Sequence, residues 1–116
     1  EAGRPFMEIK IHQDGDVAVA VVSGEIDSKT AGAAQAELLP LIEKSSKAVL
    51  DLKQVTFMSS AGLRMLLLLY RQATAREGKV ALVGLSDEIK DTMSMTGFLN
   101  FFRVAETLEA AKLALA

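Results

Sequence analysis

The chain has no cysteine and no long apolar run, and each absence removes a class of protein. Without cysteine there is no disulfide and no thiol chemistry, which fits a reducing compartment. The longest apolar run, Met65 to Tyr70, is far shorter than the roughly 18 residues that a membrane-spanning helix needs. The start of the chain also lacks the basic and apolar stretches of a secretory signal. We therefore expect a cytoplasmic protein that is not inserted in a membrane.

The chain also lacks an excess of one charge, with 13 basic and 15 acidic residues and a formal net charge of −2. This balance gives no electrostatic basis for binding nucleic acid or an anionic membrane. Its 116 residues, half of them hydrophobic, are enough for one domain with its own core. We expect the domain to span residues 7–116, with Met7 as the natural start and residues 1–6 as an expression-derived or disordered extension.

Groups that could form a catalytic or metal site are scarce. The one histidine, His12, lies on the polar side of an alternating strand pattern, so we favour a solvent-facing side chain over a catalytic or metal-binding one. A lone histidine without cysteine does not predict a transition-metal site. The glycines match neither a Walker-type loop nor a dinucleotide fingerprint, and no Gly-x-Ser-x-Gly marks a hydrolase. We expect neither an enzyme nor a cofactor-binding protein.

What the chain does contain is an alternation of apolar strand patterns with helical spacing. The expected strands cover residues 8–12, 17–22, 48–52, 80–83 and 101–104. The expected helices cover residues 30–44, 60–76, a segment that begins at Ser86 and is ended by Gly97, and 107–116. Asp14-Gly15-Asp16 favours a hairpin turn over a calcium loop. This order predicts an α/β fold, with a mixed, largely parallel sheet of about five strands, an N-terminal hairpin and about four covering helices.

Three local breaks in these patterns carry further expectations. Residues 24–28 interrupt the second strand, and Pro40 is expected to kink the first helix. Glu77-Gly78-Lys79 is expected to end the second helix, because glycine is the usual residue after a helix C-terminus.

The second helix is apolar on more than one side. One face carries five apolar residues: Leu63, Leu66, Leu67, Tyr70 and Ala73. Met65 and Leu68 lie off that face, so either neighbouring helices cover both flanks or apolar surface is left for a partner. Met93, Met95 and Phe98 raise the same question further along the chain.

Two hydroxyls, Ser59 and Ser60, lie at the junction between the third strand and the second helix. The first turn of a helix has free N–H groups and a dipole that favours negative charge, so this is a suitable place for phosphate. Serine is also a preferred N-cap, and spacing alone favours capping over phosphorylation. Gly62 costs helix propensity in this first turn. It indicates either close approach of another group or a tight fit against the protein's own sheet.

Three stretches, taken in order and at their spacing, resemble the STAS domain family, specifically the bacterial anti-sigma factor antagonists. They are Gly24-Glu25-Ile26-Asp27; Val49-Leu50-Asp51-Leu52 with Val55, Phe57 and Met58 after it; and Ser59-Ser60-Ala61-Gly62-Leu63. The resemblance extends over nearly everything from Met7 to the C-terminus, and it implies a single STAS-type domain.

The resemblance also implies a mechanism. In this family a serine kinase of the histidine-kinase-like ATPase type is also the anti-sigma factor, and the unphosphorylated antagonist binds it and frees sigma. The kinase then phosphorylates the serine that aligns with Ser60, the complex separates, and a PP2C-type phosphatase reverses the reaction. The implied partner-binding residues are Asp27, Ser59, Ser60, Ala61, Gly62 and Arg64. Arg64 could pair with a phosphate or face solvent, and we favour solvent.

The chain departs from the family at Ser59, where many members have aspartate. The change removes a fixed negative charge and makes Ser59 a second candidate for phosphorylation. It also keeps open a STAS module with another partner, such as a histidine kinase or a transport complex. A third hypothesis is a small-ligand-binding or hydrolytic domain that uses hydroxyls at the helix N-terminus.

Overall fold

The computed structural model describes residues 7–116, so the expectation for residues 1–6 lies outside the described residues. Its sheet has five strands in the order β1-β2-β3-β4-β5, with β1 antiparallel to β2 and the remaining pairs parallel. The strands are β1 (Met7–Asp14), β2 (Val17–Ile26), β3 (Lys47–Met58), β4 (Lys79–Val83) and β5 (Arg103–Ala105). The α-helices are α1 (Ala31–Lys44), α2 (Ser60–Ala75), α3 (Asp87–Met95) and α4 (Leu108–Leu115), with a 3-10 helix, η1, at Phe98–Phe101. The predicted α/β fold with a mixed, largely parallel sheet is confirmed.

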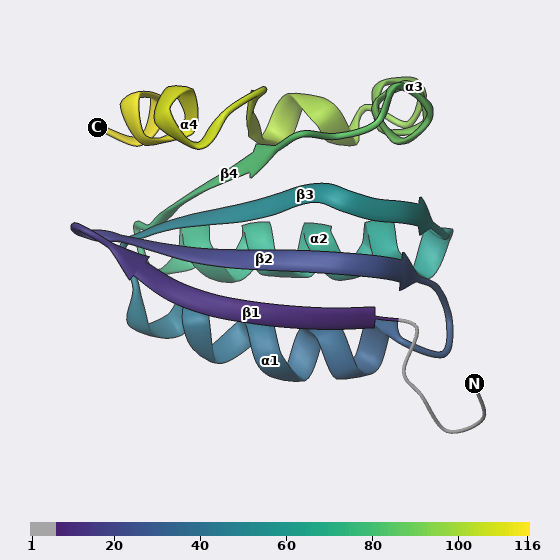
Figure 1. Ribbon diagram of the computed structural model, residues 1–116, viewed down its shortest axis with the longest axis horizontal. Helices are drawn as coiled ribbons and strands as arrows, with labels where there is room; N and C mark the ends of the chain where they lie inside the picture. Colours follow the sequence, from purple (N-terminus) through teal and green to yellow (C-terminus); the bar gives the residue numbers. More distant parts are fainter. Residues whose placement is uncertain (1–6) are drawn as a thin grey trace.

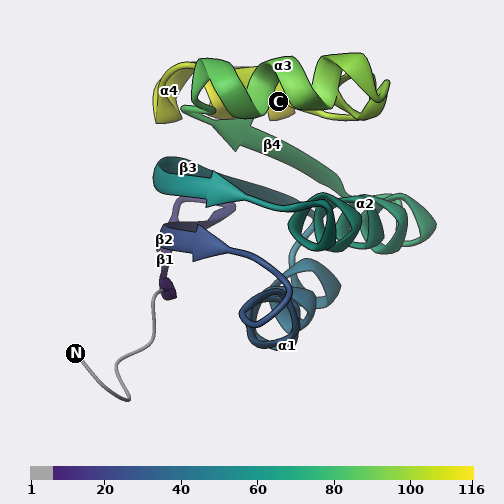
Figure 2. The same cartoon turned by 90° about the vertical axis from the view of Figure 1, so that its right-hand side faces the viewer.

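The helices cover the sheet in two layers. α1 and α2 lie on one face, α4 lies on the other, and α3 lies beyond β4 (Figures 1 and 2). The larger core joins the sheet to α1, α2 and α3, and the smaller one joins it to α4 through Ala111 and Leu115. None of the helices within residues 7–116 has the length and apolar character needed to cross a membrane.

The hairpin forms where the sequence predicts it. Gly15 has a φ of 65°, a left-handed conformation that glycine adopts without steric cost, and β1 and β2 pair from Asp14 and Val17 outwards. His12 on β1 is exposed, as expected.

β2 and β3 both run further than the sequence patterns predict. β2 does not stop before residues 24–28 but continues to Ile26, and β3 continues past Leu52 to Met58. Two register shifts in the β2–β3 pairing absorb the irregular sequence, so the two strands end level with each other at Ile26 and Met58. β4, by contrast, ends level with Asp51 of β3. Beyond that point β3 is paired with β2 alone.

The buried face of α2 is shifted towards Met65 and Leu69, whereas Leu67 and Tyr70 of the predicted apolar face are half-buried. Its buried residues are Gly62, Leu63, Met65, Leu66, Leu69 and Ala73. Met65 is only 3 % exposed, and α1 packs beside α2 on the same face of the sheet. Neighbouring elements therefore explain Met65, while Leu68 is half-buried. α1 itself continues through the exposed Pro40 to Lys44.

In the second half of the chain, α2 ends where the sequence predicts it, whereas the strand expected over residues 101–104 begins later. The left-handed residue after α2 is Glu77, with a φ of 61°, whereas the N–H of Gly78 donates to the Ala73 carbonyl at 2.7 Å. Phe101 and Phe102 precede β5 instead of starting it, because their rings pack against Tyr70 with centroids 5.3 Å and 5.6 Å away.

The start and end of α3 agree with the sequence. The Ser86 hydroxyl accepts a hydrogen bond from the Ile89 N–H at 3.2 Å, and Gly97 has the left-handed φ of 81°. Of the two methionines of α3 in question, Met93 is fully buried and Met95 is 87 % exposed. Phe98 is half-buried against the larger core.

Candidate functional site

The candidate site lies where β2 and β3 end together. The Ser59 N–H donates to the Ile26 carbonyl at 2.8 Å, which fixes the start of α2 beside the loop that follows β2. Two segments 32 positions apart, 27–30 and 59–62, are therefore brought to the same edge of the sheet.

Ser59 is the N-cap of α2. Its backbone is extended, with φ −85° and ψ 178°, and its hydroxyl accepts a hydrogen bond from the Ala61 N–H at 3.2 Å. The Ser59 carbonyl accepts the first helical hydrogen bond, from the Leu63 N–H at 3.0 Å. The side chain is half-buried. The hydroxyl of Ser59 is thus engaged in starting the helix.

Ser60 is the first residue of α2 and is exposed. Within residues 7–116 its hydroxyl takes part in no hydrogen bond, unlike that of Ser59. Free N–H groups and the positive end of the helix dipole surround this position, so negative charge on Ser60 is favoured. Of the two hydroxyls, that of Ser60 is the more exposed and has no hydrogen-bond partner among residues 7–116.

Gly62 is buried against the protein's own strand. A Cβ placed on it would lie 2.6 Å from Met58 Cγ, 2.9 Å from Ile26 Cγ2 and 3.1 Å from the Ile26 carbonyl oxygen. Of the two explanations for this glycine, the tight fit against the sheet is correct. Ala61, next to it, is half-buried.

Asp27 organises the neighbouring loop. Its carboxylate accepts hydrogen bonds from the N–H groups of Lys29 at 2.9 Å and Thr30 at 3.1 Å, while its own N–H donates to the Thr30 hydroxyl at 2.9 Å. The Lys29 N–H is the largest cause that lowers the pKa of Asp27, and it outweighs the desolvation that acts in the opposite direction. Asp27 is therefore ionised at neutral pH, and its hydrogen bonds to Lys29 and Thr30 fix the loop that leads into α1.

The remaining expected site residue, Arg64, is exposed and forms no ion pair among the described residues. Its position agrees with the solvent-facing interpretation. Within residues 7–116 no group of three or more histidine, aspartate or glutamate side chains could hold a metal ion.

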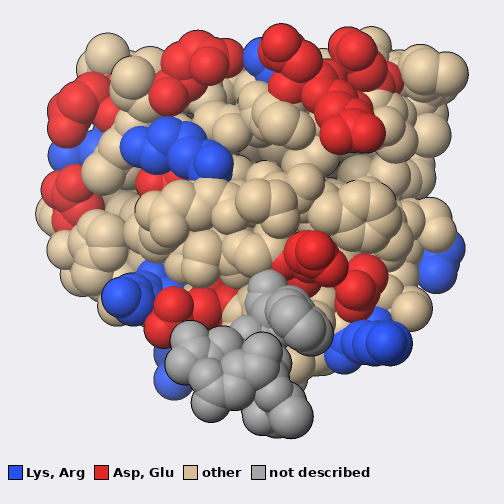
Figure 3. Space-filling model, turned by 45° about the vertical axis from the view of Figure 1, so that its right-hand side comes forward, with Lys and Arg blue, Asp and Glu red and all other residues tan. Residues whose placement is uncertain are grey.

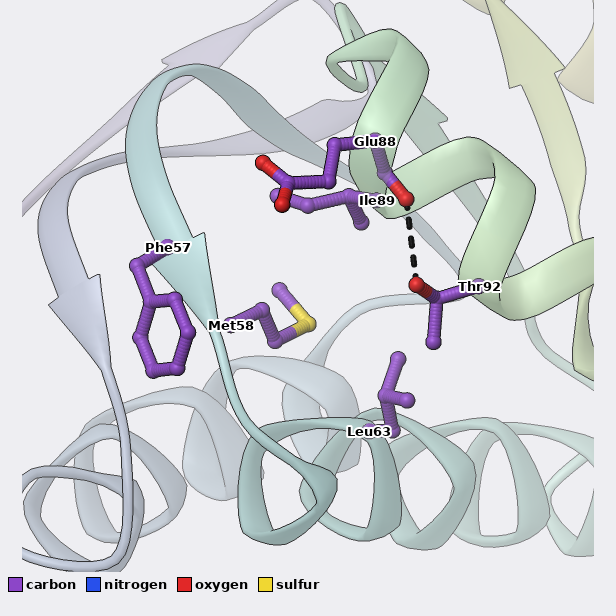
Figure 4. Close-up of a pocket in the computed structure, with 6 residues that line it drawn as sticks. All are labelled: Phe57, Met58, Leu63, Glu88, Ile89 and Thr92. Atoms are coloured by element: carbon purple, nitrogen blue, oxygen red, sulfur yellow. Dashed lines mark hydrogen bonds between the residues drawn. The ribbon is translucent and has the colours of Figure 1, made fainter.

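The sequence did not reveal a groove of about 130 Å³ at the junction of β3 and α2, between the end of β3 and α3 (Figure 4). Its lining residues are Phe57, Met58, Leu63, Glu88, Ile89 and Thr92. The groove exists because β4 ends at Val83, level with Asp51 of β3. The chain then enters α3, which lies beside the part of β3 that β4 does not cover. The apolar residues Phe57 and Met58 were visible in the sequence, but the placement of α3 was not.

Comparison with known proteins gives one consistent result. A family model described as "STAS domain" matches residues 8–111. A putative anti-sigma factor antagonist of Bordetella bronchiseptica, BtrV, is 32 % identical over 90 % of this chain and 91 % of its own length. The crystal structure of an anti-sigma factor antagonist from Mycobacterium paratuberculosis superposes with a TM-score of 0.86 at 27 % identity, covering 94 % of this chain and 93 % of that one.

The fold is also that of a more distant solved structure. The phosphorylated form of SpoIIAA from Bacillus superposes with a TM-score of 0.71 at 18 % identity, covering 92 % of this chain and 99 % of that chain.

Proposed function

Because this chain belongs to the STAS domain family, we propose that it is an anti-sigma factor antagonist that acts by switching between partners. In its unphosphorylated form it binds an anti-sigma factor that is also a serine kinase of the histidine-kinase-like ATPase type, and a sigma factor is released. Phosphorylation of Ser60 ends that interaction, and a PP2C-type phosphatase restores it. The chain itself catalyses no reaction.

The observation that carries this proposal is the division of roles between the two serines. Ser59 caps α2 through its hydroxyl, which leaves the Ser60 hydroxyl exposed and unbonded among the described residues. Aspartate and serine are both good N-caps, so Ser59 can replace the aspartate of many family members without losing the cap. Ser60 is accordingly our phosphorylation site, ahead of Ser59.

The geometry of the site also supports a reason why phosphorylation of Ser60 would release the antagonist from the kinase. Phosphorylation adds roughly −1.5 to −2 charges at pH 7. The site already contains the ionised Asp27 beside the start of α2. A partner packed over Ser60 would meet a bulky dianion beside the Asp27 carboxylate, and the steric clash and the cost of desolvating that charge weaken the complex without a rearrangement of the antagonist.

The test uses the kinase that the Ser60→Ala protein captures from the native cell, purified on its own. Incubation with ATP and phosphopeptide mapping should place the phosphate on Ser60. Ser60→Ala should bind the kinase as wild type does, and Ser60→Glu should bind it at least tenfold more weakly. Phosphate on neither serine would overturn the switching mechanism, whereas phosphate on Ser59 alone would reassign the site.

A further inference from the structure

The groove between β3 and α3 is apolar at its base and acidic at its rim. Phe57, Met58, Leu63 and Ile89 supply the apolar lining, and Glu88 extends from α3 across the opening towards β3 (Figure 4). Its volume of about 130 Å³ approaches the roughly 150 Å³ of a cavity that takes up benzene. The groove therefore has room for about one large apolar side chain.

The charge of α3 is one-sided where it faces solvent. Asp87, Glu88 and Asp91 are exposed and form no ion pair within residues 7–116. The one base of the helix, Lys90, is paired with Glu106 at 3.1 Å. Acidic side chains accordingly gather at the upper edge of the surface, above a band that carries no charged side chain (Figure 3). Such a field attracts a basic segment.

The groove borders the strand-to-helix junction that carries Ser60. Met58 and Leu63, two of its lining residues, lie on either side of Ser60 in the chain and belong to the same strand-to-helix junction. Phe57, at the mouth, is 49 % exposed, so a large apolar side chain of the groove is accessible to a partner. A partner placed over Ser60 therefore also reaches the groove.

We propose that this groove is the specificity pocket for the kinase and that it receives one apolar side chain of that partner, flanked by an arginine or lysine that pairs with Glu88. The inference rests on the proposed function and adds the chemistry of the partner surface. Thr92 forms the wall on the α3 side, and its hydroxyl donates a hydrogen bond to the Glu88 carbonyl at 3.1 Å. A larger residue at position 92 would fill the groove.

The experiment measures binding of the same purified kinase by titration at low and high salt. Glu88→Lys and Thr92→Phe should each weaken binding at least tenfold, and Glu88→Gln should reduce the dependence of binding on salt. Glu43→Lys is the matched charge control, since Glu43 is exposed near the C-terminal end of α1, and Ser94→Phe is the matched size control on α3. Both controls should bind within about twofold of wild type.

The outcomes separate this inference from the proposed function. If wild type binds the kinase and Ser60→Glu does not, but Glu88→Lys and Thr92→Phe bind as well as their controls, the pocket is wrong and the function stands. If wild type does not bind the kinase, both are overturned. Thermal unfolding of each variant shows whether a loss of binding comes from misfolding, and a weakened but folded Thr92→Phe supports the pocket.

Discussion

At the scale of single residues, the two adjacent serines have different environments although they are chemically identical. Ser59 is half-buried and bonded to the Ala61 N–H, whereas Ser60 is exposed. The difference follows from one backbone hydrogen bond, from the Ser59 N–H to the Ile26 carbonyl, which fixes the residue at which α2 begins. The cap and the proposed phosphate acceptor are therefore separate residues.

The two serines should respond differently to removal of the hydroxyl. Ser59→Ala should lower the free energy of unfolding by about 1 kcal/mol, because the Ala61 N–H loses its partner, and Ser59→Asp should restore most of it. Ser60→Ala should change it by less than about 0.5 kcal/mol. Urea denaturation followed by circular dichroism measures all three. Equal losses for the two alanine variants would contradict the assignment of the cap.

Gly62 gives a second prediction, with Gly32 as its control. Gly62→Ala should destabilise the protein by about 1 to 3 kcal/mol, since the added Cβ would overlap Met58 and Ile26. Gly32→Ala, on the exposed side of α1 with no atom within 4 Å of the new Cβ, should stabilise it by roughly 0.5 to 1 kcal/mol through helix propensity. The two midpoints of denaturation should move in opposite directions.

The lowered pKa of Asp27 predicts that the stability of the fold depends on pH. Its pKa in the folded protein is lowered, chiefly by the Lys29 N–H, so its ionised form stabilises the fold above the ordinary aspartate pKa of 3.8. That contribution is lost as the pH falls through the lowered value. Asp27→Asn should therefore melt at a lower temperature than wild type at pH 7, and the difference should shrink as the pH falls below 3.8. A difference that stays constant with pH would show that the carboxylate charge has no role.

At the scale of secondary-structure elements, the length of β3 relative to β4 determines the shape of the site. β3 extends past the end of β4 at Asp51, and α3 lies beside the part of β3 that pairs only with β2, so a groove is left between α3 and β3. α3 is short, and its attachment depends on few side chains: Ile89 and Met93 are its buried residues.

The two methionines of α3 test this attachment within one helix. Met93→Ala should cost about 2 to 5 kcal/mol, because Met93 is fully buried in the larger core. Met95→Ala should change stability by less than about 0.5 kcal/mol, because Met95 is 87 % exposed. Thermal unfolding of the two variants provides the comparison, and a similar loss for both would mean that α3 packs with a different face.

At the scale of the whole molecule, the fold places Ser60 at a helix N-terminus that can accept added negative charge without a change in conformation. The β2–α1 and β3–α2 loops meet at the same edge of the sheet, and α2 directs its N-terminus outwards there. Added charge on Ser60 interacts favourably with that helix end. Switching can then act on the partner alone.

This arrangement predicts that Ser60→Glu folds as wild type does. Its near- and far-ultraviolet circular dichroism should be unchanged, and its stability should equal that of wild type or exceed it by about 0.3 to 1 kcal/mol through the helix dipole. The increment should shrink with added salt. A large change in the near-ultraviolet spectrum would indicate a conformational switch instead of a local charge effect.

Much of the fold could be predicted from the sequence because its signals are local. Apolar periodicity marks each strand and helix, and Gly15, Ser86 and Gly97 mark turns and helix ends through properties of single residues. The ends of β2 and β3 could not be predicted in this way, since pairing across two register shifts extends both strands through residues that resemble a loop.

For the candidate site too, features set by local sequence could be predicted and features set by tertiary contacts could not. The sequence by itself placed Ser59, Ser60 and Gly62 at a strand-to-helix junction, because hydroxyl and glycine preferences at helix starts are local. Only the tertiary structure decided which serine caps the helix, since both are suitable caps and the choice depends on the Ser59–Ile26 hydrogen bond from a neighbouring strand. It likewise decided the groove beside them, which depends on where α3 packs against β3 and so on contacts between distant parts of the chain.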